Sequence, residues 1–266
     1  MISRRKDIKM LLAFNKSLIT ACIVSVSLLS TSGPILAADN LMIITEDYPP
    51  LNFVENGVLR GPSVDIVKAI QDRLNIKNVI KVYPWARGYH LLKTKTNTAL
   101  FSTTLSKKRE GLFKWVGPIA EKKIGFFAKK SRGIRLKSLA DAQGFMIGVQ
   151  RDGVGMQLLE EWGHKKIDAS TGAEANLKKL MGGRNDLWFS SNATVAGNSK
   201  KLNIDVNELE QVLVIDNTFM YIAFNEGTSD EIINLWQDTY DALVKEGVVK
   251  NIFQQHDLKS LYPTFH

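Results

Sequence analysis

Cysteine is nearly absent from this sequence. Cys22 is the only cysteine among 266 residues, and it lies in a segment with the pattern of a cleavable leader, described below. The rest of the chain can therefore form no disulfide, thiolate metal site or thiol nucleophile. Histidine is scarce as well, and the histidines lack the spacing of metal ligands, so we expect no metal site. They are His90, His164, His256 and His266.

A large excess of positive charge is also lacking once the leader is set aside. The formal net charge is +8, but the first 38 residues hold five of the 35 basic and one of the 27 acidic residues, which leaves 30 and 26, or +4. This balance argues against nucleic acid as a partner. We expect the basic clusters to be solvated faces, with attraction of an anionic ligand or a membrane partner as the alternative. They are Lys107-Lys108-Arg109, Lys122-Lys123 and the run from Lys129-Lys130 to Lys137.

Catalytic motifs are sparse. The segment nearest to a nucleophile elbow, Gly61-Pro62-Ser63-Val64-Asp65, contains a proline and ends in an aspartate. The turn Gly153-Val154-Gly155 starts like a dinucleotide-binding loop but lacks the third glycine, so we expect no cofactor.

Residues 1–38 have the pattern of a secretory signal peptide. The apolar run from Leu18 to Leu29 is about a dozen residues, short of the roughly 20 needed to span a bilayer. Small residues suited to cleavage end at Ala38. A lipoprotein site at Cys22 would leave the apolar stretch from Ile23 to Leu36 as a tail, which disfavours lipidation. We therefore expect a periplasmic protein. The basic residues of the leader are Arg4, Arg5, Lys6, Lys9 and Lys16.

The chain after the leader alternates short apolar strands with amphipathic helices. Removing 38 residues from 266 leaves 228, enough for one large domain or two small lobes. Strands are predicted at Leu41 to Thr45, Val79 to Tyr83 and Thr98 to Phe101. Helices are predicted between them at Val64 to Leu74 and Arg87 to Leu92. This order indicates a parallel sheet with helices on its faces.

A second cycle of the same kind follows. It comprises strands at Phe145 to Val149 and Asp186 to Ser190, helices at Met156 to Trp162 and Ala173 to Met181, extended segments at Ile124 to Ala128 and Met220 to Phe224, and a final helix from Glu231 to Phe253 broken at Gly247. We expect an α/β protein with two lobes, each a mostly parallel sheet flanked by helices, joined by two crossing strands. The first lobe would comprise 39–121 with the return segment 218–266, and the second 122–217. Ligands bind at the carboxyl ends of such strands, so the cleft between the lobes is the predicted site.

The loop after the first strand combines aromatic and proline residues. Pro49-Pro50 would hold Tyr48 and Phe53 in a fixed arrangement, and Asn56-Gly57 predicts a hairpin turn. These aromatics would either form a wall for a small ligand or cover the core of the lobe. Trp85 follows the second strand, so we expect it at the edge of the cleft.

The segment from Ser102 to Arg109 is rich in hydroxyl groups and ends on an arginine. An arginine binds a carboxylate through two parallel hydrogen bonds, and hydroxyl or backbone N–H groups complete such an anion site. The alternative is a surface pair of Arg109 with Glu110. The turn at Gly153-Val154-Gly155 lies between a strand and a helix, so its N–H groups offer a second anion position.

Taken in order, the landmarks resemble those of the bacterial extracellular solute-binding proteins of family 3, the periplasmic receptors of polar amino-acid ABC transporters. The resemblance runs from about Leu41 to Phe253. It rests on Tyr48-Pro49-Pro50, Gly61-Pro62-Ser63-Val64-Asp65-Ile66, Ser106-Lys107-Lys108-Arg109, Gly117-Pro118, Gly182-Gly183-Arg184-Asn185-Asp186-Leu187 and Leu243-Val244-Lys245-Glu246-Gly247-Val248. It implies the two-lobed periplasmic binding protein fold of type II, which closes around its ligand by a hinge.

The resemblance also implies a set of ligand-binding residues. Arg109 would bind the ligand carboxylate, and the remaining residues would line the site around it. These are Ser102 and Thr104 at the same end, Glu46 and Tyr48 from the first loop, Trp85 packed on the ligand, and Gly153, Val154 and Gly155 from the second lobe.

Two positions depart from the pattern of the family. Val154 replaces a threonine, and Ser191 stands where the family usually has an aspartate that pairs with the ammonium group of the ligand. Loss of the partner of a buried charge costs on the order of 3 kcal/mol, about a hundredfold in affinity. A carboxylate or other anion without an ammonium group, or a larger and partly exposed molecule, is therefore favoured over an α-amino acid.

We expect a monomeric binding protein, not an enzyme, that captures a small polar or anionic solute and delivers it to an inner-membrane ABC permease. The first alternative is a non-transport module that presents the bound solute to a sensor protein. The second is a dehydratase on the same fold, which would need a buried general acid. Glu46 and Asp47 are the acidic residues expected near the cleft.

Overall fold

The computed structural model describes residues 40–264. The predicted signal peptide at 1–38, and Cys22 with it, lies outside the described residues. None of the helices in the described range is both long and apolar enough to cross a membrane.

One sheet of eight strands runs through this part of the chain in the order β4-β1-β5-β10-β6-β9-β7-β8. Strands β2 and β3 form a separate hairpin. The strands are β1 (Met42–Thr45), β2 (Phe53–Glu55), β3 (Val58–Arg60), β4 (Lys81–Val82), β5 (Thr98–Thr104), β6 (Phe113–Lys129), β7 (Ile147–Gln150), β8 (Ile167–Ser170), β9 (Leu187–Ser191) and β10 (Leu209–Asn225).

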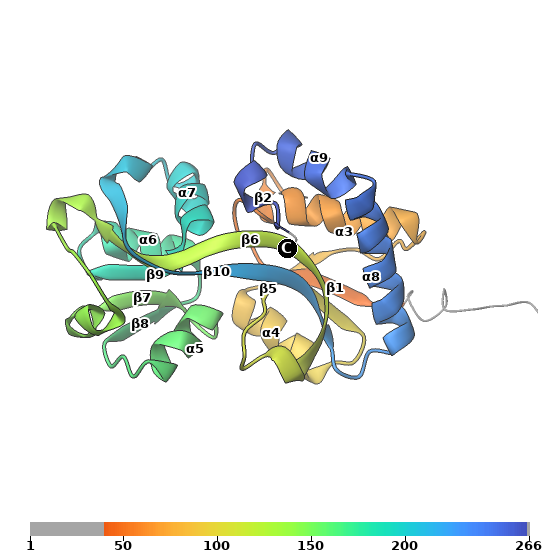
Figure 1. Cartoon of the computed structure of the whole chain (residues 1–266), viewed down its shortest axis with the longest axis horizontal. Coiled ribbons are helices and arrows are strands. Elements are labelled where there is room, and N and C mark those ends of the chain that lie inside the picture. The colour runs from red at the N-terminus through yellow and green to blue at the C-terminus, as the bar shows by residue number, and fades with distance from the viewer. Residues whose placement is uncertain (1–39, 265–266) are drawn as a thin grey trace, which may run out of the picture. The chain divides into compact units, whose positions relative to one another are not determined.

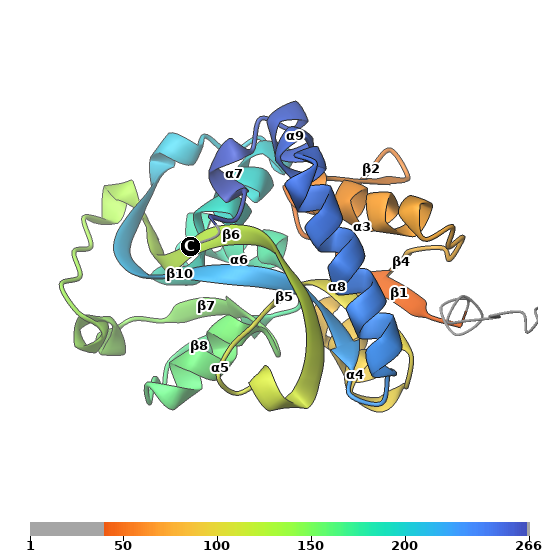
Figure 2. The same ribbon diagram turned by 45° about the vertical axis from the view of Figure 1, so that its right-hand side comes forward.

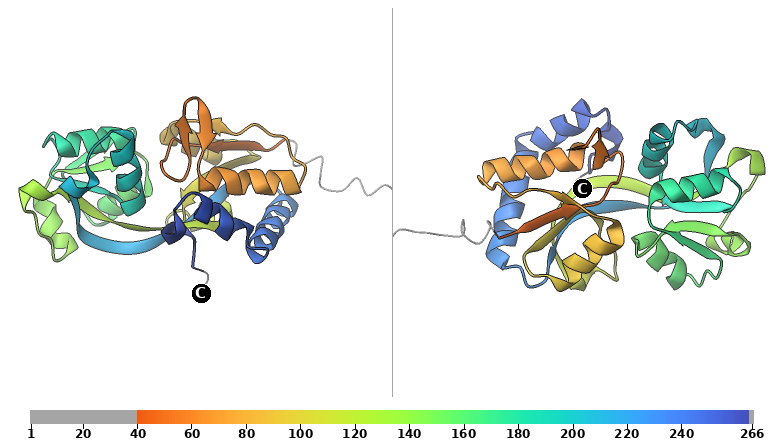
Figure 3. Two further views of the ribbon diagram at one scale, coloured as in Figure 1. Left: turned by 90° about the horizontal axis from the view of Figure 1, so that it is seen from above. Right: turned by 180° about the vertical axis from the view of Figure 1, so that it is seen from behind.

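Helices flank this sheet on both sides of the strands (Figure 3). They are α3 (Pro62–Arg73), α4 (Trp85–Thr94), α5 (Val154–Glu161), α6 (Ala173–Met181), α7 (Asn192–Lys201), α8 (Asp230–Lys245) and α9 (Val248–Gln255). Short 3-10 helices are η1 (Glu110–Leu112), η2 (Lys130–Arg132), η3 (Leu139–Gly144), η4 (Val206–Glu208) and η5 (Lys259–Leu261).

The two ends of the sheet are parallel, and its centre is antiparallel. Strand β1 pairs in parallel with β4 and β5, and β7 pairs in parallel with β8 and β9. The long strands β6 and β10 pair with each other antiparallel and run side by side through the middle of the molecule (Figure 1). The predicted α/β class, with mostly parallel strands flanked by helices and two crossing strands, is thereby confirmed.

The crossing strands divide the described chain into two halves. We call β4, β1 and β5 with α3, α4, α8 and α9 the first lobe, and β9, β7 and β8 with α5, α6 and α7 the second lobe. The predicted boundaries after residues 121 and 217 fall at adjacent positions on the two strands, because Lys122 pairs with Thr218. The boundaries themselves stay a prediction.

Helix α3 shows how the sequence builds the first lobe. Ile66, Val67 and Ile70 recur on one face and are fully buried against the sheet. Pro62 opens the helix, where its missing N–H has no intrahelical partner to lose. Gly61 caps it with φ 116°, and an added Cβ would collide with the carbonyl of Leu51. Helices α8 and α9 pack beside α3 (Figure 2).

Each lobe has a hydrophobic core of its own. In the first lobe, the fully buried Trp236 of α8 packs edge-on against Phe224 of β10 at 5.4 Å between ring centroids. In the second lobe, Phe126 of β6 packs against Phe189 of β9 at 4.9 Å. Because β6 and β10 contribute to both cores, each lobe is anchored to the same pair of strands.

Several local predictions are confirmed and two elements are new. The hairpin turn at Asn56-Gly57 is present, with φ 52° and 77° at its two residues. Gly247 separates α8 from α9 with φ 78°. The predicted strand at Val79 to Tyr83 is wrong in extent, because only Lys81–Val82 pairs with β1 and Val79 is 76% exposed. Helix α7 and strand β8 were not predicted.

Candidate functional site

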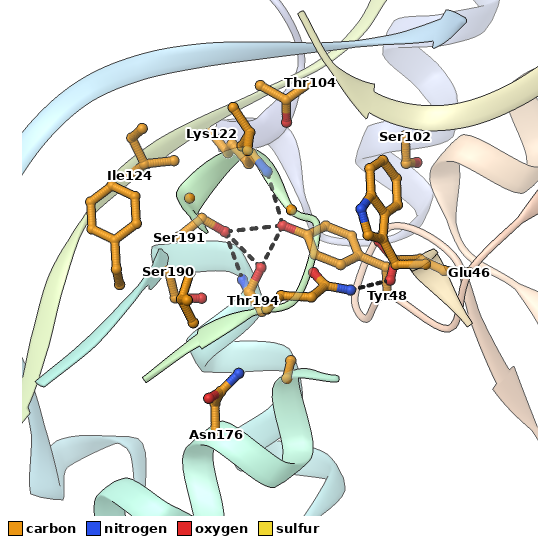
Figure 4. Close-up of a pocket in the computed structure, with 18 of the residues that line it drawn as sticks. Glu46, Tyr48, Ser102, Thr104, Lys122, Ile124, Asn176, Ser190, Ser191 and Thr194 are labelled. Atoms are coloured by element: carbon orange, nitrogen blue, oxygen red, sulfur yellow. Dashed lines mark hydrogen bonds between the residues drawn. The ribbon is translucent and has the colours of Figure 1, made fainter. Parts of the chain in front are cut away.

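A cavity of about 70 Å³ lies between the two lobes (Figure 4). One water molecule needs about 10–15 Å³ on this scale. The space therefore holds about five to seven water-sized groups, which suits a small solute. All ten residues that the sequence analysis placed at the site line this one cavity. They are Glu46, Tyr48, Trp85, Ser102, Thr104, Arg109, Gly153, Val154, Gly155 and Ser191.

The strand ends explain why these residues meet. Glu46 follows the last residue of β1, Thr104 ends β5 and Ser191 ends β9. The carboxyl ends of parallel strands lie at one edge of a sheet, and the two halves of this sheet present those edges to each other across the cavity. Trp85 opens α4 and Val154 opens α5, so both lie at the start of a helix that follows such an edge.

Arg109 is buried in the cavity wall, with 1% of its surface exposed. Its guanidinium donates to the backbone carbonyl of Thr104 at 3.3 Å and lies over the rings of Trp85 and Tyr89 at 5.2 and 4.8 Å. Burial lowers its pKa from the usual value. The Nε group has no hydrogen-bond partner within residues 40–264. The predicted alternative, a surface pair with Glu110, is wrong, and an unsatisfied buried donor suits an anion.

The carbonyl oxygen of Asp152 joins the lobes at this end of the cavity. It accepts a hydrogen bond from the indole Nε1 of Trp85 at 2.8 Å and another from Nη2 of Arg109 at 3.2 Å. Asp152 has φ 55°, which turns the chain between β7 and α5. The turn from the second lobe therefore contacts the arginine through the backbone oxygen of Asp152. The approach of Gly153, Val154 and Gly155 to a ligand carboxylate stays a prediction.

Gly155 is required by close packing in this turn. A Cβ at Gly155 would lie 2.8 Å from Cδ1 of Phe189 and 3.0 Å from Cγ2 of Val149. The absence of a side chain lets the first turn of α5 approach the sheet beside the cavity. Val154 lines the cavity next to it with an apolar side chain.

Glu46 is a buried carboxyl. It lies on the side of the Tyr48 ring away from Ser191 and Thr194 (Figure 4). Its Oε2 accepts a hydrogen bond of 2.5 Å from Nε2 of Gln150, a residue of the second lobe. Burial raises its pKa to about 7, while the Gln150 bond and the charges of Lys122 and Arg109 act in the opposite direction. The carboxyl therefore titrates near neutral pH.

Three hydroxyl groups meet at the end of the cavity near β9. The Tyr48 hydroxyl accepts from Thr194 Oγ1 at 2.6 Å and lies 3.5 Å from Ser191 Oγ. Ser191 and Thr194 share a bond of 2.8 Å, and Ser191 caps α7 by accepting from the Thr194 N–H at 3.1 Å. Ser191, the last residue of β9, therefore bonds to the helix that it caps. We call Tyr48, Ser191 and Thr194 the hydroxyl cluster.

Lys122 corrects a prediction made from the sequence. We expected the Lys122-Lys123 pair to be solvated, yet Lys122 is 7% exposed, and Lys123 alone is exposed. The Nζ of Lys122 donates to the Tyr48 hydroxyl at 3.1 Å. Successive side chains of a strand point to opposite faces, so β6 turns one lysine into the cavity and the other toward solvent.

Other lining residues were also missed by sequence reasoning. Gln150 and Asn176 come from the second lobe, and Thr194 from the unpredicted α7. The Ser191-to-Thr194 spacing is that of an N-cap and could have indicated the helix start. Phe53, by contrast, lies in the hairpin and is not among the residues that line the cavity.

The charged residues of the cavity wall are two cations, Arg109 and Lys122, and one carboxyl, Glu46. The wall is therefore net positive, which favours an anionic solute. No group of His, Cys, Asp or Glu side chains within residues 40–264 could hold a metal ion.

Comparison with known protein families matches residues 41–258 to the bacterial extracellular solute-binding proteins, family 3. No curated protein matches the sequence in a direct comparison.

Solved structures share the fold at low sequence identity. A histidine kinase sensor domain with similarity to periplasmic binding proteins superimposes with a TM-score of 0.77 at 19% identity, covering 85% of this chain and 99% of that one. A substrate-binding protein of an ABC uptake transporter from Streptococcus pneumoniae, with bound histidine, gives 0.75 at 15% identity over 86% and 96%. An ancestral arginine-binding protein bound to arginine gives 0.70 at 23% identity over 81% and 96%. The predicted two-lobed periplasmic binding fold is confirmed.

Proposed function

The chain belongs to the bacterial extracellular solute-binding proteins of family 3, and on that premise we propose that it captures a small carboxylate-bearing solute between its lobes and delivers it to an ABC permease. The observation that carries this proposal is Arg109. A buried guanidinium that faces a cavity with an unsatisfied Nε suits a carboxylate that completes its hydrogen bonds. Ser102 and Thr104 line the same cavity.

Capture proceeds by closure of the lobes about β6 and β10. Hydrogen bonds from Gln150 to Glu46 and from Trp85 to Asp152 cross between the lobes, so a ligand in the cavity touches both lobes at once. Such a ligand stabilises the closed form because the open form would offer it the contacts of one lobe alone. The hinge is proposed where Lys122 pairs with Thr218.

The proposed location is the periplasm, and the proposed solute lacks an ammonium group. The solved relatives with bound ligands hold amino acids, namely histidine and arginine. By the resemblance to the family, Ser191 stands where an aspartate usually pairs with the ammonium group of the ligand, and Glu46 is bonded to Gln150.

The test is a thermal-shift screen of the purified protein against monocarboxylates, dicarboxylates, sugar acids and amino acids. By linkage, a ligand at about 100 times its dissociation constant adds roughly 2.7 kcal/mol of stability, a shift of several degrees. The stabilisation should disappear in Arg109→Gln and persist in Lys107→Gln, which removes an exposed positive charge two residues away. Equal stabilisation of both variants would contradict the proposal.

A second candidate is a sensor module without a transport role. The observation that favours it is the similarity to a histidine kinase sensor domain over 99% of that domain. Deletion of the gene separates the two functions. A transport receptor is needed for uptake of the labelled solute, whereas a sensor module is needed for the transcriptional response to it and leaves uptake unchanged.

A further inference from the structure

Lys122 is a buried cation that forms no ion pair at contact distance with a carboxylate in the described part of the chain. With 7% of its surface exposed, its ammonium group is largely removed from water. The hydrogen bond that it makes within residues 40–264 goes to the Tyr48 hydroxyl at 3.1 Å, and it also lies 5.2 Å from the centre of the Tyr48 ring. An ammonium group carries three N–H donors, so two remain to be satisfied. A buried charge in this condition favours an anion beside it.

The hydroxyl cluster offers further donors at the same place. Thr194 donates its proton to Tyr48, and Ser191 is free to donate to Thr194 over 2.8 Å. The proton of Tyr48 then has Ser191 as its acceptor at 3.5 Å, longer than an ordinary O–H···O bond of about 2.5–3.0 Å. The Tyr48 proton can therefore turn toward a ligand at little cost in hydrogen-bond energy.

The cluster is correspondingly poor in free acceptors. The Tyr48 oxygen already accepts from Lys122 and Thr194, and the Ser191 oxygen already accepts from the Thr194 N–H. A ligand ammonium group would need acceptors here and would also lie beside a positive charge. The chemistry at Ser191 is therefore suited to a ligand anion and opposed to a ligand ammonium group.

The two cations form separate centres on one cavity wall. Arg109 bonds to the carbonyls of Thr104 and Asp152, whereas Lys122 bonds to Tyr48. Both lie close enough to Glu46 to act on its charge. Below about pH 7 Glu46 keeps its proton, so the site carries two positive charges, of which a ligand with a single carboxylate would neutralise only one.

We propose that Lys122, assisted by the Tyr48 and Ser191 hydroxyls, is a second anion subsite, and that the preferred solute is a small dicarboxylate without an ammonium group. The inference depends on the proposed function, in which Arg109 binds the first carboxylate. The residue that would repel the second carboxylate, an aspartate at position 191, is absent from this chain.

Calorimetric titration tests the subsite with two probes that each differ from glutarate by one charged group. Glutarate is compared with butyrate, which lacks the second carboxylate, and with glutamate, which adds an ammonium group. Glutarate is expected to bind at least about 30-fold tighter than either probe, because hydrogen bonds to charged groups are worth about 10- to 100-fold in affinity. Succinate and adipate establish which spacing of carboxylates the cavity takes.

Variants assign the effect to the lysine. Lys122→Met is expected to lower glutarate affinity about 10- to 100-fold and butyrate affinity less than threefold. Lys123→Met removes a positive charge from the adjacent, exposed position and should change neither. Tyr48→Phe, which keeps the ring and removes one donor, should lower glutarate affinity several-fold and serves as the decisive variant if Lys122→Met does not fold. Ser191→Asp should reverse the preference toward glutamate.

The outcomes separate this inference from the proposed function. Butyrate or glutamate binding as tightly as glutarate would overturn the dicarboxylate subsite while leaving a carboxylate receptor in place. An equal loss of affinity for glutarate and for butyrate in Lys122→Met would also overturn it, because the lysine would then support the structure of the whole site. Failure of every carboxylate to bind the unmodified protein would overturn both.

Discussion

Gly197 of α7 lies directly against Pro49 of the loop that follows β1. A Cβ added to Gly197 would lie 2.7 Å from the backbone carbon of Pro49 and 2.8 Å from its oxygen. These atoms belong to backbone and have little freedom to move away. The contact joins the second lobe to the first, so the missing side chain at position 197 permits the lobes to approach as closely as they do.

Gly197→Ala should therefore weaken ligand binding without weakening the fold. Alanine stabilises a helix interior by about 1 kcal/mol relative to glycine, so the melting temperature without ligand should hold or rise. Affinity for the best carboxylate should fall at least about tenfold, because closure brings the new methyl group against Pro49. Gly144→Ala is the control, since a Cβ there meets nothing within 4 Å. Unchanged affinity would show that closure does not use this contact.

The elements that the sequence predicted correctly are those with regular apolar patterns. Helix α3 repeats buried Ile66, Val67 and Ile70 at helical spacing, and the Asn56-Gly57 turn is specified by two residues that adopt positive φ readily. Helix α7 was missed because its buried face includes Asn198 and Ser199, which break the apolar pattern. Its start is set instead by the Ser191 cap.

The site was predicted best where a residue is unusual for its neighbourhood. Arg109 was identified because it ends a run of hydroxyl residues, and the structure buries it in the cavity wall. Lys122 was missed because adjacent lysines are typical of a solvated surface. A two-residue alternation along an extended segment would have indicated that Lys122 and Lys123 point to opposite faces, but which of them faces inward depends on pairing with β10, which is not local in sequence.

Glu46 should make stability depend on pH. Its pKa is about 7 in the folded protein against 4.5 without the fold, so between these values the folded state keeps a proton that the unfolded state releases. Stability therefore falls as pH rises through this window, by about 3 kcal/mol at about 1.4 kcal/mol for each unit. Glu46→Gln should not show this loss. Urea unfolding at pH 4.5 and pH 8 measures the difference.

The exposed Glu55→Gln is the control for that measurement. It should follow the unmodified protein at both pH values, because its side chain is 59% exposed and does not line the cavity. A parallel pH dependence of the unmodified protein and Glu46→Gln would show that Glu46 is not the titrating group.

Lys201 should contribute little to closure despite two short ion pairs. Its Nζ lies 2.7 Å from Asp47 of the first lobe and 2.7 Å from Glu174 of the second, but all three side chains are more than a third exposed. Exposed pairs are typically worth about 1 kcal/mol or less and are screened by salt. Lys201→Met should reduce ligand affinity by less than about fivefold at low salt and leave it unchanged at 1 M salt, measured against Lys200→Met. A larger loss that survives high salt would contradict this assignment.

Asn52 should be the residue of the first loop on which stability depends most. Fully buried, it donates to Thr45 Oγ1 at 2.9 Å and to the carbonyl of Glu46 at 2.7 Å, and it accepts from Ser102 Oγ at 2.5 Å. Asn52→Ala leaves three buried groups without their partner, and each such group costs about 1–3 kcal/mol. Three such groups cost about 3 kcal/mol or more, so we expect the melting temperature to fall by at least about 6 °C. Ligand affinity should fall too, because the hydrogen bonds of Asn52 hold the loop that carries Glu46 beside the end of β5 that carries Ser102. The exposed Asn207→Ala should change neither, and a melting temperature of Asn52→Ala within 1 °C of the unmodified protein would show that the loop is held by its packing alone.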